Sequence, residues 1–181
     1  MVCIAGFDVN IVESKGKGAI VFWNSESNSI VYENTCEMNC TEIYIPGQLA
    51  KRELPFFIEL SKHFPTLPDY IIVDGNGRFH PEKNGLACQI SKFLQQNTLD
   101  IPVIGVSKNL FQFPGIKIEN NYIHYQDEIV AYQLLSGFAT NPVYVSIGGF
   151  LTLNKAIEIV KSCSIYRIPE PIRFADKLSR S

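Results

Sequence analysis

The chain has 181 residues, of which 46% are hydrophobic and 19% are charged, and its formal net charge is −2. This length predicts a single domain over residues 1–181 with a substantial hydrophobic core. No apolar run reaches the ~18 residues that a membrane span needs, and the acid in MVCIAGFDV comes too early for a signal peptide. The five cysteines, an odd number without paired spacing, indicate reduced thiols, so we expect a cytoplasmic protein with no membrane partner. The net charge does not favour nucleic-acid binding, but a local basic patch would be enough to attract phosphates.

The first third of the chain is predicted to form an antiparallel meander of three strands. Val2–Val12 is apolar and rich in residues that favour strands, Gly16–Gly18 is the expected turn, and Ala19–Trp23 is the second strand. The polar stretch Asn24–Ser29 predicts the next turn, and the alternation in Ile30–Thr35 predicts the third strand.

After the meander, apolar strands alternate with helices. Residues from Leu49 to Phe64 repeat at helical spacing, and Pro55 suggests that this helix begins near Leu54, because proline fits a first turn best. The other predicted elements are strands at Tyr70–Val73, Ile101–Val106 and Val143–Ile147, helices at Asn84–Gln96 and Leu153–Cys163, and a hairpin of Ile116–Ile118 with Tyr122–Tyr125. This order predicts an α/β fold, in which a mixed β-sheet is flanked by helices on both faces.

Three carboxylates, Asp8, Glu53 and Asp74, interrupt the apolar pattern. Buried ionised acids are costly unless they are paired or coordinated. Glu53 could be an acid at a helix start, and Asp74 could belong to an Asp-Gly turn, but Asp8 falls at neither a turn nor a cap. If the strand of Asp8 lies beside that of Asp74, the acids converge on a hard cation such as Mg²⁺ or Mn²⁺. Such a site is suited to phosphodiester hydrolysis.

Several long motifs, in the same order along the chain, resemble the endonuclease V family. They are TEIYIPGQLAKRELPFF, VDGNGRFHPEKNGLACQI, PVIGVSKNLF, VYVSIGG and YRIPEPIRFAD. The resemblance implies a ribonuclease H-like fold and a metal-dependent nuclease that acts as a monomer on inosine-containing DNA or RNA. It also implies cleavage at the second phosphodiester 3′ to the deaminated base, with 3′-hydroxyl and 5′-phosphate products.

The resemblance also suggests roles for individual residues. Asp8, Glu53 and Asp74 match the family's metal-binding acids, and Lys108 matches its active-site lysine, which would hold a phosphate or the attacking water. Standing alone, Lys108 would more often be a solvated lysine. Residues matching the substrate-binding segments are the strand-separating wedge Tyr44, Ile45 and Pro46, and the base-pocket residues Gly47, Leu49, Gly75, Gly77 and His80.

The alternatives for these segments are structural. The wedge residues could be an ordinary exit from a strand, the glycines could serve turns, and His80 could hydrogen-bond the backbone of its own loop. An apolar wedge would replace the stacking that is lost when a base leaves the duplex.

The chain departs from the family's usual pattern at several positions. Gly149 and Asp176 stand where the family usually has histidine, and Glu82-Lys83 stands where it has a pair of arginines. We expect Asp176 to be a fourth metal-binding carboxylate; otherwise it is a surface acid near the chain's end. The alternatives are a weakened family member that binds nucleic acid without efficient cleavage, or a metal-dependent nuclease with another lesion or structure specificity. The sequence does not distinguish DNA from RNA.

Overall fold

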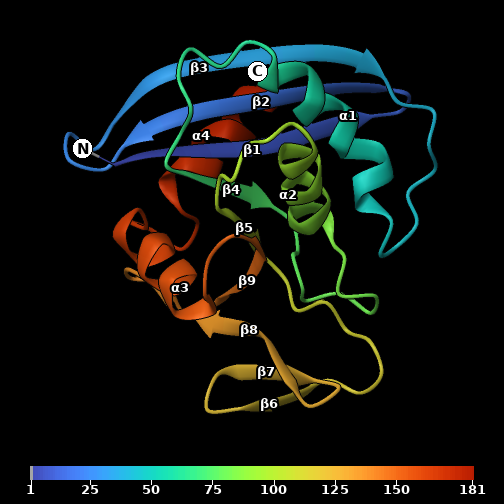
Figure 1. Ribbon diagram of the computed structural model, residues 1–181, viewed down its shortest axis with the longest axis vertical. Helices are drawn as coiled ribbons and strands as arrows, with labels where there is room; N and C mark the ends of the chain where they lie inside the picture. Colours follow the sequence, from blue (N-terminus) through green and yellow to red (C-terminus); the bar gives the residue numbers. More distant parts are fainter. Residues whose placement is uncertain (1) are drawn as a thin grey trace.

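The computed structural model describes residues 2–181, and these residues form one nine-stranded mixed sheet and four helices (Figure 1). The strands are β1 (Cys3–Val12), β2 (Lys15–Asn24), β3 (Ser29–Asn39), β4 (Tyr70–Asp74), β5 (Val103–Ser107), β6 (Lys117–Glu119), β7 (Tyr122–Tyr125), β8 (Glu128–Leu134) and β9 (Val143–Gly149). Their order in the sheet is β3-β2-β1-β4-β5-β9-β8-β7-β6. β4 pairs in parallel with β1 and β5, and the other pairs are antiparallel.

The helices are α1 (Leu49–Ser61), α2 (Leu86–Gln96), α3 (Leu153–Ser162) and α4 (Glu170–Ser179). α1 and α2 share one hydrophobic core with β1 and β4, whereas α3 and α4 belong to a second core on the other face. Figure 1 shows α4 behind the long strands β1 and β2, with α1 and α2 in front. The predicted α/β fold with helices on both faces is therefore confirmed.

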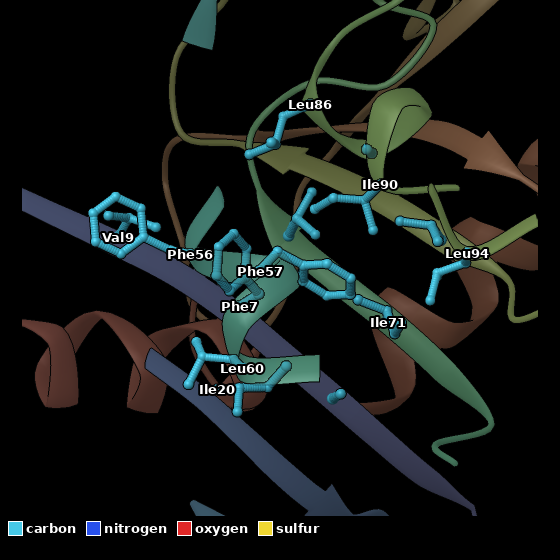
Figure 2. Packing of buried hydrophobic residues seen from close by; sticks show 14 of the residues in the cluster. Phe7, Val9, Ile20, Phe56, Phe57, Leu60, Ile71, Leu86, Ile90 and Leu94 are labelled. Carbon is cyan, nitrogen blue, oxygen red and sulfur yellow. The ribbon is translucent and has the colours of Figure 1, made fainter. Parts of the chain in front are cut away.

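The first core joins the apolar stripe of α1 to the sheet (Figure 2). Phe56, Phe57 and Leu60 of α1 are buried against Phe7 of β1, and the rings of Phe7 and Phe57 meet edge to face with centroids 5.3 Å apart. Edge-to-face pairs of this kind add about 0.5–1.5 kcal/mol beyond the burial of their area. α1 is thereby fixed against β1, the strand that carries Asp8.

Two predicted details of the first third are wrong. The β1–β2 turn is at Glu13 and Ser14, not at Gly16–Gly18, and those glycines lie inside β2. A Cβ at Gly16 would lie 2.3 Å from Cζ of Phe56, so glycine is needed there for close packing under α1. Likewise, α1 begins at Leu49 and contains Pro55, because burying its apolar stripe outweighs the loss of one backbone hydrogen bond.

Two elements were not predicted at all, namely β8 and α4. β8 is only partly buried and extends the sheet beyond β9. α4 buries Ile172 and Ala175 at helical spacing, and it has Glu170 and Pro171 in its first turn and Lys177 in its last turn, which are favourable signals at helix ends. Within residues 2–181, no helix combines the length and apolar composition that crossing a membrane requires.

Candidate active site

The sheet register brings Asp8 and Asp74 to neighbouring positions. Phe7 of β1 pairs in parallel with Val73 of β4, and each acid follows directly after its paired residue. Phe7 and Val73 belong to the core beneath α1 and α2. Since side chains alternate along a strand, the two acids point to the opposite face, where α4 packs.

Asp176 of α4 completes a cluster with these two acids. One carboxylate oxygen from each of Asp8, Asp74 and Asp176 lies within 4.8 Å of the other two. Ser179, one turn further along α4, donates a hydrogen bond to Oδ2 of Asp8 at 2.8 Å, so α4 is joined directly to β1. The structure thus places Asp176 beside the two strand acids, with its side chain partly buried.

The cluster is electrostatically unfavourable by itself. Burial and the nearby negative charge of Asp74 raise the pKa of Asp8 to about 6, although the hydrogen bond from Ser179 opposes this rise. Such a raised pKa means that ionising Asp8 beside the charge of Asp74 is unfavourable in the folded protein without a cation. Three hard oxygen donors that repel one another fit a small divalent cation such as Mg²⁺ or Mn²⁺.

The basic side chains of Arg180 and Lys108 both pair with the cluster. Arg180 pairs with Asp176, whereas Lys108 pairs with two of the aspartates and makes the shortest contact. Its Nζ lies 2.6 Å from Oδ2 of Asp74 and 3.3 Å from Oδ1 of Asp176. Burial opposes the charge of Lys108, but the two aspartates outweigh burial and raise its pKa. Arg167, which was not singled out from the sequence, donates hydrogen bonds to the backbone carbonyls of Lys108 and Pro142 and so holds the loop that follows β5.

Glu53 is not one of the three acids that form the cluster in residues 2–181. It is buried in the second turn of α1, so the alternative of an acid at a helix start is wrong. Burial, followed by the charges of Asp8 and Asp74, raises the pKa of Glu53 well above its usual value. Glu53 therefore interacts electrostatically with Asp8 and Asp74 from the α1 side.

A small cavity of ≈ 90 Å³ lies on the α1 and α2 side, next to the loop that follows Asp74. Four of the residues predicted to bind substrate line it, namely Tyr44, Gly47, Leu49 and His80. The cavity also has walls that the sequence did not reveal, and these are Ala50, Asn76, Gly85, Leu86, Gln89 and Phe111. They come from separate segments that only the folded chain brings together.

His80 joins the two loops that form this cavity. Its Nδ1 accepts a hydrogen bond from the backbone N–H of Glu82, so Nε2 carries the proton and donates to the carbonyl of Gly47 at 2.7 Å. Gly47 has a φ of +82°, a conformation that favours glycine. His80 thus both lines the cavity and fixes the loop that carries the predicted wedge.

The predicted wedge residues lie at the surface beside this cavity. Tyr44 is 59% exposed and Ile45 is 46% exposed, so both side chains are accessible to a bound molecule. The guanidinium carbon of Arg52 lies 5.6 Å from the centroid of the Tyr44 ring, a cation–π distance that supports the ring from the side of α1. Pro46 follows them in the turn before α1.

Gly75 and Gly77 do not line the cavity directly. A Cβ at Gly75 would lie 3.3–3.4 Å from the side chains of Leu86 and Leu49, which are themselves part of the wall. A Cβ at Gly77 would lie 2.2 Å from the carbonyl oxygen of Ile147, and the N–H of Gly77 donates to Oγ of Ser146. Gly77 therefore serves the close packing of the loop against β9.

Gly149, one of the departures from the family pattern, lies against α2. A Cβ at this position would lie 2.2 Å from Oγ of Ser91. The space next to Gly149 is therefore occupied by Ser91, and a larger side chain requires the Ser91 hydroxyl to rotate away or the two elements to shift.

The Endonuclease V family model matches residues 1–177 of the chain. Endonuclease V of Mus musculus is 32% identical over 205 residues, which cover 98% of this chain and 58% of the mouse protein. The crystal structure of the catalytic domain of human Endonuclease V has a TM-score of 0.88 and 28% identity, covering 99% of this chain and 81% of that chain. Ciona intestinalis Endonuclease V, solved with a 24mer DNA containing an inosine followed by a ribo-adenosine, has a TM-score of 0.87 and 28% identity, covering 99% and 84%.

These matches span the sheet, all four helices and the loops that hold the aspartate cluster and the cavity, and they confirm the expected ribonuclease H-like fold. The chain spans 58% of the length of its mouse relative, so the likeness concerns that part of the relative. Both the sequence and the structure therefore show that the chain belongs to the endonuclease V family.

Proposed function

We propose that this protein is a divalent-metal-dependent endonuclease that cleaves inosine-containing DNA or RNA. It cuts at the second phosphodiester 3′ to inosine and leaves a 3′-hydroxyl and a 5′-phosphate. The observation that carries the proposal is the aspartate cluster, in which oxygens of Asp8, Asp74 and Asp176 lie within 4.8 Å of one another. The loop after Asp74 leads from this cluster to the cavity. Membership of the endonuclease V family and the inosine-containing DNA bound to the Ciona relative support this substrate.

Asp8, Asp74 and Asp176 would hold the metal, with Glu53 buried next to them on the α1 side. A bound Mg²⁺ or Mn²⁺ would supply Lewis acidity at the phosphate and lower the pKa of a water. Lys108 offers a positive charge within 3.3 Å of two of these aspartates, which suits it to hold a phosphate oxygen near the cluster. Ser179 and Arg167 are positioning residues, since they fix Asp8 and the Lys108 loop.

The cavity and the exposed Tyr44 would select the base. A flipped nucleotide leaves its stack at a cost of a few kcal/mol, and the Tyr44 ring offsets part of that cost by filling the gap. A planar nucleobase in the cavity would face the backbone of Gly47 and Gly85 and the side-chain amides of Asn76 and Gln89. These groups offer both hydrogen-bond donors and acceptors to the edge of the base.

The test is a cleavage assay on oligonucleotides that differ only at one base. Inosine, adenosine and guanosine versions of single- and double-stranded DNA and RNA are incubated with Mg²⁺, Mn²⁺ or EDTA. We expect cleavage of the inosine versions with either metal and none with EDTA. Binding of inosine substrates without cleavage would instead identify a weakened family member. Equal cleavage of all three bases would indicate a nuclease of another specificity.

A further inference from the structure

On the face of the sheet that carries Asp8, the side chains of β2 change from apolar to basic along the strand. In β2, Trp23, Val21 and Ala19 share this face and are buried, and Ala19 and Val21 pack against α4. The next two residues on the same face are Lys17 and Lys15. Nζ of Lys17 contacts Ser181, which follows the end of α4 at Ser179. The apolar part of the face is therefore covered by α4, and the basic part is left open.

The neighbouring strands continue this open part of the face. The register pairs Asn10 with Lys17 and Val12 with Lys15, and it pairs Lys17 with Glu37 and Lys15 with Asn39. Side chains directly opposite in a sheet point to the same face, so these six residues share the face of Asp8. The intervening residues point the other way, as shown by Gly16, over which the ring of Phe56 packs.

This open face forms a groove. Asn10, Val12, Lys15, Lys17, Glu37 and Asn39 contribute to a hollow with a volume of ≈ 440 Å³. Asn10 is two residues beyond Asp8 on β1, so at about 3.3 Å per residue the groove begins about 7 Å from the aspartate cluster. Nζ of Lys17 donates to the backbone carbonyl of Ser181 at 2.9 Å, which leaves its other two protons for further acceptors.

We propose that this groove, the β1–β3 groove, binds the sugar–phosphate backbone of the nucleic-acid strand on the 3′ side of the scissile phosphodiester. The proposal rests on the proposed function, because it takes the aspartate cluster as the site of cleavage. It adds a contact outside the base cavity and the cluster, made by Lys15 and Lys17 with the help of the amides of Asn10 and Asn39.

The direction in which the nucleic acid crosses the site follows from the two protein segments that leave the cluster. The loop after Asp74 leads to the cavity on the α1 and α2 side, whereas the strand after Asp8 leads to the groove on the α4 side. A base held in the cavity lies 5′ to the cut in the proposed reaction. The part of the nucleic acid on the 3′ side of the cut therefore leaves the site on the other face of the sheet, over the groove.

The chemistry of the groove favours a phosphate backbone over an apolar partner. Its polar side chains are two lysines, two asparagines and one glutamate, and its large apolar groups are Val12 and Met38. Lysine and asparagine are common donors to phosphate and sugar oxygens and carry no sequence information there. Glu37 opposes phosphate binding, so the groove is a moderate contact that contributes affinity and no base specificity.

The test compares Lys15→Ala/Lys17→Ala with a matched control, Lys155→Ala/Lys161→Ala, which removes the same charge from α3. Binding of fluorescent single-stranded inosine DNA is measured in EDTA with a constant 5′ arm and a 3′ arm of either two or about ten nucleotides. We expect the groove variant to bind the long-armed DNA several-fold more weakly than the wild type, and the short-armed DNA equally well. The slope of log K against log salt for the long arm should fall by about 1.4, since each phosphate contact to a single strand contributes about 0.7.

A variant with the opposite effect completes the test. Glu37→Gln removes the negative charge facing Lys17 and should strengthen binding of the long-armed DNA alone. Equal binding by the wild type and the groove variant at both arm lengths, or an equal loss in the α3 control, would overturn the proposal. Cleavage of the inosine strand by the wild type is measured in parallel with Mg²⁺. Failure of cleavage would count against the proposed function, whereas the dependence of binding on arm length tests the groove by itself.

Discussion

Asp8 and Asp74 break the apolar pattern of two buried strands, and the structure shows the electrostatic cost of that break. Asp8 has a pKa raised to about 6 by burial and by Asp74, and the pKa of Glu53 is raised by burial and by both aspartates. Lys108 offsets part of this repulsion at 2.6 Å from Asp74. The acids are therefore held in place by α4 and by Lys108 at a cost in stability that a bound cation would remove.

Replacing Asp74 with asparagine tests the cluster at its centre. The amide keeps the shape but removes the charge that would hold a metal, so we expect cleavage with Mg²⁺ to fall by more than about a hundredfold, because even indirect partners of metal sites contribute 10–100-fold. Binding of inosine DNA should be unchanged or stronger, since a charge that repels phosphate is lost. Single-turnover cleavage and equilibrium binding measure the two effects, with the exposed Asp100→Asn as control. An Asp74→Asn protein that cleaves at the wild-type rate would rule out this cluster as the metal site.

The raised pKa of Asp8 predicts how the metal-free protein depends on pH. Because the folded protein binds the Asp8 proton more tightly than the unfolded chain does, this stabilisation is complete below pH 3.8 and is lost as pH rises through about 6. A rise from 3.8 to about 6 corresponds to roughly 3 kcal/mol. In EDTA, Asp8→Asn should therefore be more stable than the wild type at pH 7.5, by up to that amount, and gain little at pH 4. Urea unfolding at the two pH values measures the difference, and a gain that does not change with pH would show that the charge of Asp8 is not its cause.

At the scale of elements, the strands around the site could be predicted from their apolar residues, but the surroundings of the acids could not. The strand Tyr70–Val73 follows from local pattern, because parallel buried strands are apolar throughout. The convergence of Asp8 with Asp74 depended on the pairing of their strands, which the local pattern left open and the structure shows. α4 was missed although Ile172, Ala175 and Ser179 are buried at helical spacing. The segment is only ten residues long, and its prolines, Pro169 and Pro171, suggested an extended approach. Gly16 and Gly18 of β2 wrongly suggested a turn. Glycine is required at these positions because the ring of Phe56, which is distant in sequence, packs over them.

The exposed loop before α1 supports a prediction about Tyr44. Tyr44→Ala should reduce cleavage of duplex inosine substrate about tenfold more than cleavage of the single-stranded substrate, because stacking on an aromatic ring is worth about 1–3 kcal/mol per base and only the duplex must be opened. The two rates are measured on the same inosine strand with and without its complement. Equal losses on both substrates would show that the ring acts by holding Arg52 and the loop, and would count against the wedge.

The packing of α2 on β9 predicts a coupling between Gly149 and Ser91. Gly149→Ala should destabilise the protein by about 1–3 kcal/mol, because its Cβ would lie 2.2 Å from Oγ of Ser91. Ser91→Gly by itself should also destabilise, since glycine is unfavourable inside a helix. In the Gly149→Ala protein, however, the same change should cost less or restore stability. Chemical denaturation of the four proteins gives the coupling, and additive effects would show that the position accepts a side chain by some other adjustment.

At the scale of the whole molecule, the sheet separates two surfaces that meet at the aspartate cluster. The cavity with Tyr44 lies on the α1 and α2 side, and the β1–β3 groove lies on the α4 side. The motifs in the sequence pointed to the acids and to part of the cavity, because these are local segments. The groove depends on where α4 ends over β2, and the remaining cavity walls depend on how α2 and the Phe111 segment pack, so neither could be predicted before the chain was folded.

The measurement that tests the central claim most directly is the position of the cut as the inosine is moved. A set of otherwise identical strands, each with inosine at a different position, is incubated with Mg²⁺, and the product ends are mapped at single-nucleotide resolution. The account predicts one cut per strand, always at the second phosphodiester 3′ to inosine, with a 3′-hydroxyl and a 5′-phosphate. Cuts that stay in place when inosine moves, or that occur equally in strands without inosine, would contradict it.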